Sequence, residues 1–188
     1  MSIAPYWYDV NDNKKTWTNK QIVQRSCGKF RREWETSSMK EKSYTPENYP
    51  ILRYGDVLLM LAEAENEAHQ GPTDLAYECI NEIRQRAGIS KLKGLSYTDF
   101  QQAVRDERAR ELCFESLRKY DLVRWGIYVE AVHDKLGAAT QDKRWATGNQ
   151  FIGARDYAAR TQEKHQFLPI PTKELDVNGK LEQNKYWQ

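Results

Sequence analysis

The residues best placed for chemistry are charged side chains that share one face of a predicted helix. The apolar residues Phe100, Val104 and Phe114 alternate with them at intervals of three and four residues, which is the spacing of a single helical face. The charged residues on this face and at its margin are Glu107, Arg108, Glu111, Glu115 and Arg118. Two carboxylates that face a sugar across a cleft are the catalytic pair of a glycosidase, so catalysis is the first possibility to weigh.

The arrangement favours a structural ion network over catalysis. The acids share one helix with arginines, and a neighbouring arginine holds a carboxylate ionised instead of raising its pKa for general-acid work. A charge on a packing face is costly to desolvate unless it is paired. We therefore expect the glutamates to pair with Arg118 and with further arginines, for which the candidates are Arg84, Arg86 and Arg124.

The rest of the chain offers little for catalysis, metal binding or nucleic-acid binding. The three histidines lack metal-ligand spacing, and neither a phosphate-binding glycine loop nor a nucleophile elbow is present. Cys27, Cys79 and Cys113 fit neither a disulfide framework nor a zinc site. The 29 Lys and Arg against 27 Asp and Glu leave a formal charge of +2, without a basic excess. We expect no enzyme activity, no metal or cofactor, and no nucleic-acid partner.

Helices in the centre of the chain must position these residues. Apolar residues at three- and four-residue spacing predict helices over 51–69, 73–87, 98–118 and 122–136. Gly71-Pro72 joins the first two as an antiparallel hairpin, loosely like a tetratricopeptide unit. The predicted fold is therefore mainly α, built from tetratricopeptide-like helical hairpins with irregular, loop-rich flanks.

The flanks differ in composition from this centre. Residues 1–50 are rich in aromatic side chains and predict irregular structure with one short strand at 21–23. Residues 137–188 lose the helical periodicity, and prolines force the stretch 167–171 to be extended. We expect one domain over 1–188, with its helical centre at 51–136.

The overall composition points to a thin core or to a piece of something larger. Hydrophobic residues make up 39% of the 188, and charged residues make up 30%. No stretch approaches the ~18 consecutive apolar residues of a transmembrane helix, so the sequence predicts no membrane span.

Four stretches of the sequence resemble the SusD/RagB family. The run ERARELCFESLRKYDLVRWG at 107–126 is similar to its most specific signature. Three more agree with the family in the expected order: YPILRYGDVLLM with AEA at 49–64, NEIRQRAG at 81–88, and LPIP at 168–171 followed by QN at 183–184. Two departures are minor, since Ser116 replaces the usual glycine and Lys185-Tyr186 replaces the usual Pro-Gly.

The resemblance implies a function. Family members are lipid-anchored proteins on the outer-membrane surface of Bacteroidetes, where they bind oligo- or polysaccharides without catalysis and pass them to a TonB-dependent, SusC-like transporter. They are considerably longer than this chain, so we expect it to be a C-terminal portion that touches the membrane only through a lipid anchor absent from this chain. The alternative is a scaffold portion that contacts the transporter or the N-terminal half without touching the ligand.

Aromatic side chains outside the helical centre are the candidates for ligand contact. Sugars present C–H faces that pack on aromatic rings, while polar groups fix their orientation. The candidates are Trp7, Tyr8, Trp17 and Trp145. For each of them, packing against the helices or against the rest of a longer protein is the alternative role. Trp125 lies on an apolar stripe and is expected in the core.

Overall fold

The computed structural model describes residues 4–9, 11, 13–18, 27–36, 46–139 and 149–188. They belong to two compact units, which we consider separately. Unit 1 comprises Met1–Lys15 and Arg25–Arg118, and unit 2 comprises Thr16–Gln24 and Lys119–Gln188. That residues 1–188 form a single domain stays a prediction. Among the described residues, no helix is long and apolar enough to cross a membrane.

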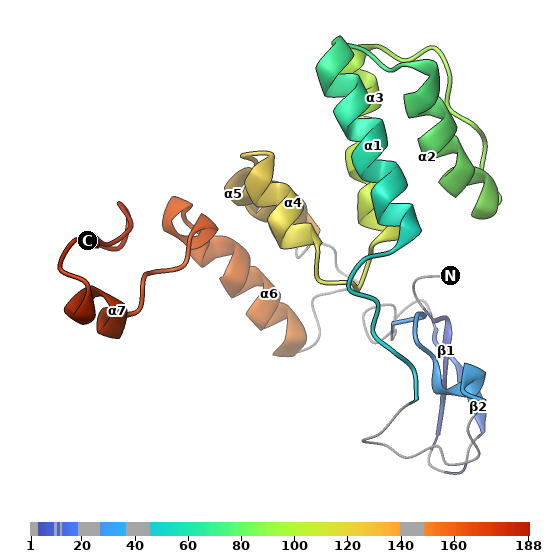
Figure 1. The fold of residues 1–188 in the computed structure, drawn as a ribbon. Coiled ribbons are helices and arrows are strands. Elements are labelled where there is room, and N and C mark those ends of the chain that lie inside the picture. The colour runs from blue at the N-terminus through green and yellow to red at the C-terminus, as the bar shows by residue number, and fades with distance from the viewer. Residues whose placement is uncertain (1–3, 10, 12, 19–26, 37–45, 140–148) are drawn as a thin grey trace. The chain divides into compact units, whose positions relative to one another are not determined.

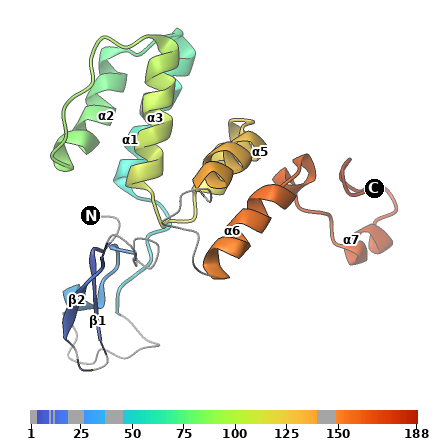
Figure 2. The same cartoon turned by 180° about the vertical axis from the view of Figure 1, so that it is seen from behind.

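Three helices form the main part of unit 1 (Figure 1). They are α1 (Tyr54–His69), α2 (Asp74–Arg86) and α3 (Tyr97–Glu111). The side chain of Thr73 caps α2 by accepting the backbone N–H of Ala76 at 3.1 Å, and Ser96 caps α3 by accepting that of Asp99 at 3.2 Å. Seen from behind in Figure 2, α3 lies alongside α1. The predicted mainly helical fold is confirmed, while its likeness to tetratricopeptide repeats stays a prediction.

The core of unit 1 lies between these three helices. Its buried side chains come from one face of each helix: Leu58, Leu59, Ala62, Ala76, Cys79, Ile80, Ile83, Phe100 and Val104. Burying a side chain of the size of Leu59 or Phe100 stabilises the fold by about 1.5–3 kcal/mol. Helix pairing therefore depends on the apolar stripes that the sequence places at helical spacing.

The third helix is shorter than the spacing predicts. It ends at Glu111, and residues 112–117 form turns before α4 (Arg118–Arg124) begins. Phe114 and Ser116 have positive φ angles of 67° and 62°, so the chain cannot continue as a helix through them. The expectation that Phe114 shares the packing face of α3 is wrong, because this side chain is 49% exposed.

The N-terminal part of unit 1 contains regular structure that the sequence did not predict. Strands β1 (Tyr6–Tyr8) and β2 (Lys14–Thr16) pair in a two-stranded sheet, and the 3₁₀ turn η2 (Arg32–Trp34) follows later. Between the strands, the Asp9 carboxylate accepts the backbone N–H groups of Asn11 and Asn13 at 2.9 Å. These bonds shape the hairpin turn. The strand predicted at 21–23 lies outside the described residues.

Unit 2 replaces the single predicted helix over 122–136 with shorter elements. After α4 come α5 (Tyr128–Ala131) and the π-helix η3 (Val132–Gly137). The break falls at Gly126, whose φ of 70° ends α4. Trp125 is half-buried and packs against the core cluster of this unit, which is formed by Leu122, Tyr128, Val132 and Ala158.

Three more elements follow in the described part of unit 2. They are α6 (Asn149–Arg160), the 3₁₀ turn η4 (Glu163–Gln166) and α7 (Thr172–Val177). The stretch between η4 and α7 is extended, as its prolines predict. Helix α6 corrects the expectation that helical periodicity is lost after residue 137. Its sequence lacks a wide apolar stripe, and Ala158 is its member of the buried cluster.

Candidate ligand-binding site

Two tyrosines of the hairpin converge on one carboxylate. The hydroxyl of Tyr6 donates to Oε1 of Glu33 at 2.5 Å, and the hydroxyl of Tyr8 donates to Oε2 at 2.9 Å. Residues two apart on a strand project from the same face, so β1 can present both phenols to η2 at once. Each carboxylate oxygen of Glu33 thus receives its own phenol.

Two cations surround this group. The guanidinium of Arg31 donates to Glu33 Oε1 at 2.6 Å and also to the hydroxyl of Tyr6. The ammonium of Lys14 lies 3.7 Å from the centre of the Tyr6 ring, and Arg31 lies 5.2 Å from the ring of Trp34. These are cation–π distances. We call the set the hairpin cluster: Tyr6, Tyr8, Lys14, Arg31, Glu33 and Trp34.

The hydrogen bonds fix the protonation states in the hairpin cluster. The bond from Tyr6, followed by those from Arg31 and Tyr8, lowers the pKa of Glu33 to about 2. The bond to Glu33 in turn raises the pKa of Tyr6 and of Tyr8. At neutral pH Glu33 is therefore an ionised acceptor between two neutral phenols. A carboxylate in this state cannot act as a general acid, so the geometry suits binding.

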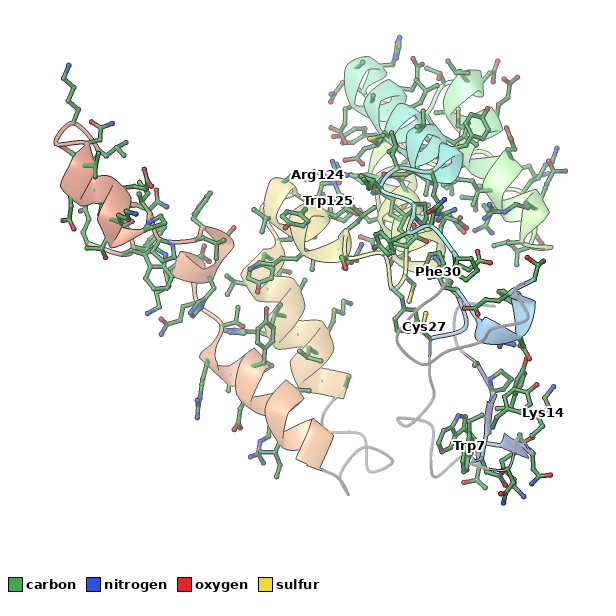
Figure 3. The ribbon with its side chains drawn as sticks, turned by 60° about the horizontal axis from the view of Figure 1, so that its bottom comes forward. Trp7, Lys14, Cys27, Phe30, Arg124 and Trp125 are labelled. Atoms are coloured by element: carbon green, nitrogen blue, oxygen red, sulfur yellow. The ribbon has the colours of Figure 1, made fainter. Side chains whose placement is uncertain are left out.

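Trp7 and Tyr8 do not share a surface. They are neighbours on β1, so their side chains project from opposite faces of the strand. Figure 3 shows Trp7 on one side of the hairpin and Lys14, which covers the ring of Tyr6, on the other. Tyr8 belongs to the hairpin cluster, whereas Trp7, 37% exposed, lies outside it.

The structure describes one of the other two predicted aromatic residues. Trp17 follows β2 and is half-buried. Trp145 lies outside the described residues. The ligand-contacting role of Trp7, Tyr8, Trp17 and Trp145 stays a prediction.

Sequence reasoning missed most of the hairpin cluster. The available signal was the pair of tyrosines two residues apart, since that spacing puts both on one strand face. Glu33 lies 25 residues beyond Tyr8 in the sequence, and no local pattern links the two. Trp34 is 60% exposed, and its ring lies beside Arg31. Only the folded structure identifies it as a candidate, because η2 sets this position.

The charged face of α3 forms ion pairs in unit 1. Arg53 contacts two glutamates, with Nη1 at 2.9 Å from Glu111 and Nε at 2.7 Å from Glu115. Lys29 donates to the Glu111 carbonyl at 2.6 Å and also pairs with Glu115. Burial alone would raise the pKa of Glu115, but the hydrogen bonds from Arg53 and Lys29 outweigh it and lower that pKa.

Further cations pair with the remaining members of this face. Arg84 contacts Glu107 at 2.8 Å, and Arg86 pairs with Glu111. Both arginines were predicted as candidate partners of the glutamates. Arg108 pairs with Asp56 at 2.8 Å. Arg118 donates to the carbonyl of Arg105 at 3.0 Å, and Arg124 donates to Asp121 at 3.0 Å.

The sequence analysis did not anticipate three of these partners, namely Lys29, Arg53 and Asp56. All three lie far from α3 in the chain, so only the folded structure reveals the pairing. Glu107, Glu111 and Glu115 each face at least one cation.

Comparison with known proteins shows which family this sequence matches. The model of the SusD family matches residues 4–187, which include the hairpin, the helices and the C-terminal segment. The chain belongs to the SusD family. The match covers both units, so the hairpin and α6 are part of the family's fold as much as the helical centre.

Two relatives come from Formosa agariphila. SusD-like protein P25 is 41% identical over 139 residues, which is 72% of this chain and 23% of that protein. SusD-like protein P2 is 28% identical over 148 residues, covering 73% of this chain and 25% of that protein. The chain therefore spans about a quarter of the length of these relatives.

Solved structures agree in fold. A SusD homolog from Bacteroides thetaiotaomicron superposes on this chain with a TM-score of 0.79 and is 32% identical in sequence. The match covers 97% of this chain and 39% of the homolog. A SusD superfamily protein from Bacteroides vulgatus has a TM-score of 0.56 at 30% identity, over 78% of this chain and 29% of that one. This chain therefore shares its fold with parts of SusD-related proteins from two Bacteroides species.

Proposed function

We propose that this chain is part of a non-catalytic glycan-binding protein on the bacterial outer-membrane surface. There it binds an oligo- or polysaccharide and delivers it to a TonB-dependent, SusC-like transporter. Membership of the SusD family supports this proposal. Under this proposal, a lipid anchor holds the protein at the membrane.

The hairpin cluster carries the proposal. Tyr6 and Tyr8 are fixed by Glu33, and Trp34 exposes an indole ring beside Arg31. A sugar needs aromatic faces for its C–H groups and charged or polar groups for its hydroxyls, and the cluster supplies both. Because the side chains are already held by hydrogen bonds, binding would cost little ordering entropy.

The paired charges of α3 support the absence of catalysis. The glutamates that could have formed a glycosidase pair face Arg53, Arg84 and Lys29. A general acid needs a raised pKa. Burial acts in that direction on Glu115, but the hydrogen bonds from Arg53 and Lys29 outweigh it and lower the pKa of Glu115.

Calorimetry on the full-length protein tests the proposal against a panel of polysaccharides and their oligomers. We expect at least one glycan to bind, and Trp34→Ala to weaken that binding by about tenfold, since an aromatic platform residue contributes about 1–3 kcal/mol. Tyr120→Ala, which removes an exposed ring from α4, is the matched control and should leave the affinity unchanged. Binding of peptides with no binding of any glycan would reject the carbohydrate ligand and leave the family assignment intact.

One observation favours the alternative, a portion that contacts the transporter or the N-terminal half without touching ligand. Tyr54, Val57 and Leu61 follow at helical spacing on α1 and are exposed, although the opposite face of α1 is buried. Under this alternative, Leu61→Glu weakens co-purification of the transporter or disturbs assembly with the N-terminal half. Trp34→Ala would then leave glycan affinity unchanged.

A further inference from the structure

Unit 2 contains a pocket of about 470 Å³ that the proposed function does not use. This volume is within the ~300–1,000 Å³ of small-molecule sites. Aromatic side chains form much of the wall: Tyr128, Tyr157, Phe167 and Trp187. Lys119, Asp156 and Arg160 also line it. All of these residues belong to unit 2, so the pocket does not depend on the position of unit 1.

The aromatic wall is held in place by its own hydrogen bonds. The hydroxyls of Tyr128 and Tyr157 are bonded to each other, and Tyr128 is buried. The indole N–H of Trp187 donates to the carbonyls of Phe167 at 3.0 Å and Lys164 at 3.1 Å. Since its polar atom is already bonded, Trp187 can offer a ligand only its ring. The pocket therefore presents preorganised ring surfaces.

Tyr128 remains neutral at any physiological pH. Burial, followed by the hydrogen bond with Tyr157, raises the pKa of Tyr128 to about 12. Tyr128 thus contributes no negative charge to the pocket.

The charges that line the pocket are unbalanced. Lys119 contacts the ring of Tyr128 at 5.4 Å but makes no ion pair with a carboxylate of the described residues, and Arg160 makes none either. Among the described residues that line the pocket, Asp156 is the one carboxylate, and it lies 3.4 Å from Arg155, which is not part of the wall. Two cations that have no acidic partner among the described residues therefore adjoin an aromatic surface.

We propose that this pocket binds a sugar ring that carries an anionic group, either a carboxylate or a sulfate ester. The C–H face of the ring packs on the aromatic wall, and the anion pairs with Lys119 and Arg160. Arginine binds both anions through two parallel hydrogen bonds, and charge-assisted bonds of this kind are about twice as strong as neutral ones. The inference rests on the proposed function in one respect, namely that the ligand is a glycan.

Calorimetry on the full-length protein tests this inference. The probes are an oligoglucuronate, a sulfated galactan oligosaccharide, and neutral gluco- and galacto-oligosaccharides of the same length. We expect at least one acidic probe to bind about tenfold tighter than its neutral counterpart, because a charged hydrogen bond contributes enough for that factor. The two acidic probes distinguish a carboxylate ligand from a sulfated one.

Two variants on the same helix supply a matched comparison. Arg160→Gln should weaken binding of the acidic probe about tenfold and leave any neutral probe unaffected. Arg155→Gln makes the same charge change on α6 outside the pocket and should leave the acidic affinity within about twofold. Arg160 is exposed and makes no ion pair among the described residues, so its replacement should not disturb folding. Lys119→Gln, from α4, provides a second, independent removal of charge.

The outcomes separate this inference from the proposed function. Equal affinity for acidic and neutral probes, or equal losses in Arg160→Gln and Arg155→Gln, would overturn the acidic-sugar pocket while glycan binding itself stands. No binding of any probe or polysaccharide would reject both. Tighter acidic binding that depends on Arg160 and Lys119 supports the pocket.

Discussion

The side-chain amide of Gln183 is hydrogen-bonded to both backbone groups of Ile170. Its oxygen accepts the Ile170 N–H at 2.8 Å, and its nitrogen donates to the Ile170 carbonyl at 2.9 Å. Pro169 and Pro171 have no N–H, so Ile170 supplies the one donor of this tripeptide. Asn184 donates to the carbonyl of Leu168 at 2.6 Å. Two sequence stretches that resemble the family, LPIP and QN, are thus in direct contact.

Gln183→Glu should lower the free energy of unfolding by about 1–3 kcal/mol. The new carboxylate keeps an acceptor for Ile170 N–H but sets an oxygen against the Ile170 carbonyl, which leaves that carbonyl without a donor. Urea unfolding of the full-length protein measures the change. Gln85→Glu, the same chemical change at an exposed position of α2, is the control. Equal stability of the two variants would show that the Gln183 bonds contribute nothing net.

Ser116→Gly should raise the free energy of unfolding by up to about 1 kcal/mol. Ser116 has a φ of 62°, a left-handed conformation that costs a side-chain-bearing residue about 1–2 kcal/mol and glycine almost nothing. Part of that gain is lost because glycine makes the unfolded chain more flexible. Thermal unfolding measures the difference. Ser90→Gly, at an exposed position without positive φ, should destabilise instead. If both glycines lower stability, the turn at Ser116 is not strained.

Local signals made part of the fold predictable. Thr73 and Ser96 cap the helices that follow them because each side chain reaches a backbone N–H three residues ahead. The apolar stripes of α2 and α3 likewise depend on residues three and four apart. By contrast, the end of α3 follows from left-handed residues at Phe114 and Ser116, and no periodic pattern encodes them.

The candidate site was less predictable because its contacts are long-range. The hairpin has strands of three residues, which are too short for a clear alternating pattern. Glu33, the carboxylate that its two tyrosines share, comes from η2, and the partners of Glu115 are Arg53 and Lys29. An acidic residue on a helix face indicates that a cation must be near, but not which one.

Arg53→Met should destabilise the protein by about 2–4 kcal/mol. Arg53 holds Glu111 and Glu115 together, and Glu115 is almost fully buried, so removing the guanidinium leaves like charges side by side. Breaking a buried ion pair costs about 3–5 kcal/mol, and partial exposure of Arg53 together with the remaining contact from Lys29 reduces that figure.

Arg110→Met is the matched control for this change. Arg110 also belongs to α3 and lies 3.8 Å from both Asp106 and Glu107, but its side chain is largely exposed, and Glu107 keeps Arg84 at 2.8 Å. Its removal should change the free energy of unfolding by less than about 1 kcal/mol. Chemical denaturation of both variants at one ionic strength gives the comparison. Similar losses in the two would mean that the pairs of Arg53 act as ordinary surface salt bridges.

Glu33 should titrate with a midpoint near pH 2 in the folded protein, against an ordinary value of 4.5. A lowered pKa contributes stability that is fully present above pH 4.5 and is lost as the pH falls toward 2. Carboxyl NMR chemical shifts measure the midpoint directly. Tyr6→Phe should raise it more than Tyr8→Phe, because the bond from Tyr6 is the largest cause of the shift and the bond from Tyr8 is smaller than that from Arg31. Equal midpoints in the wild type and both variants would show that the phenols do not hold Glu33 ionised, and the hairpin cluster would then lack its fixed acceptor.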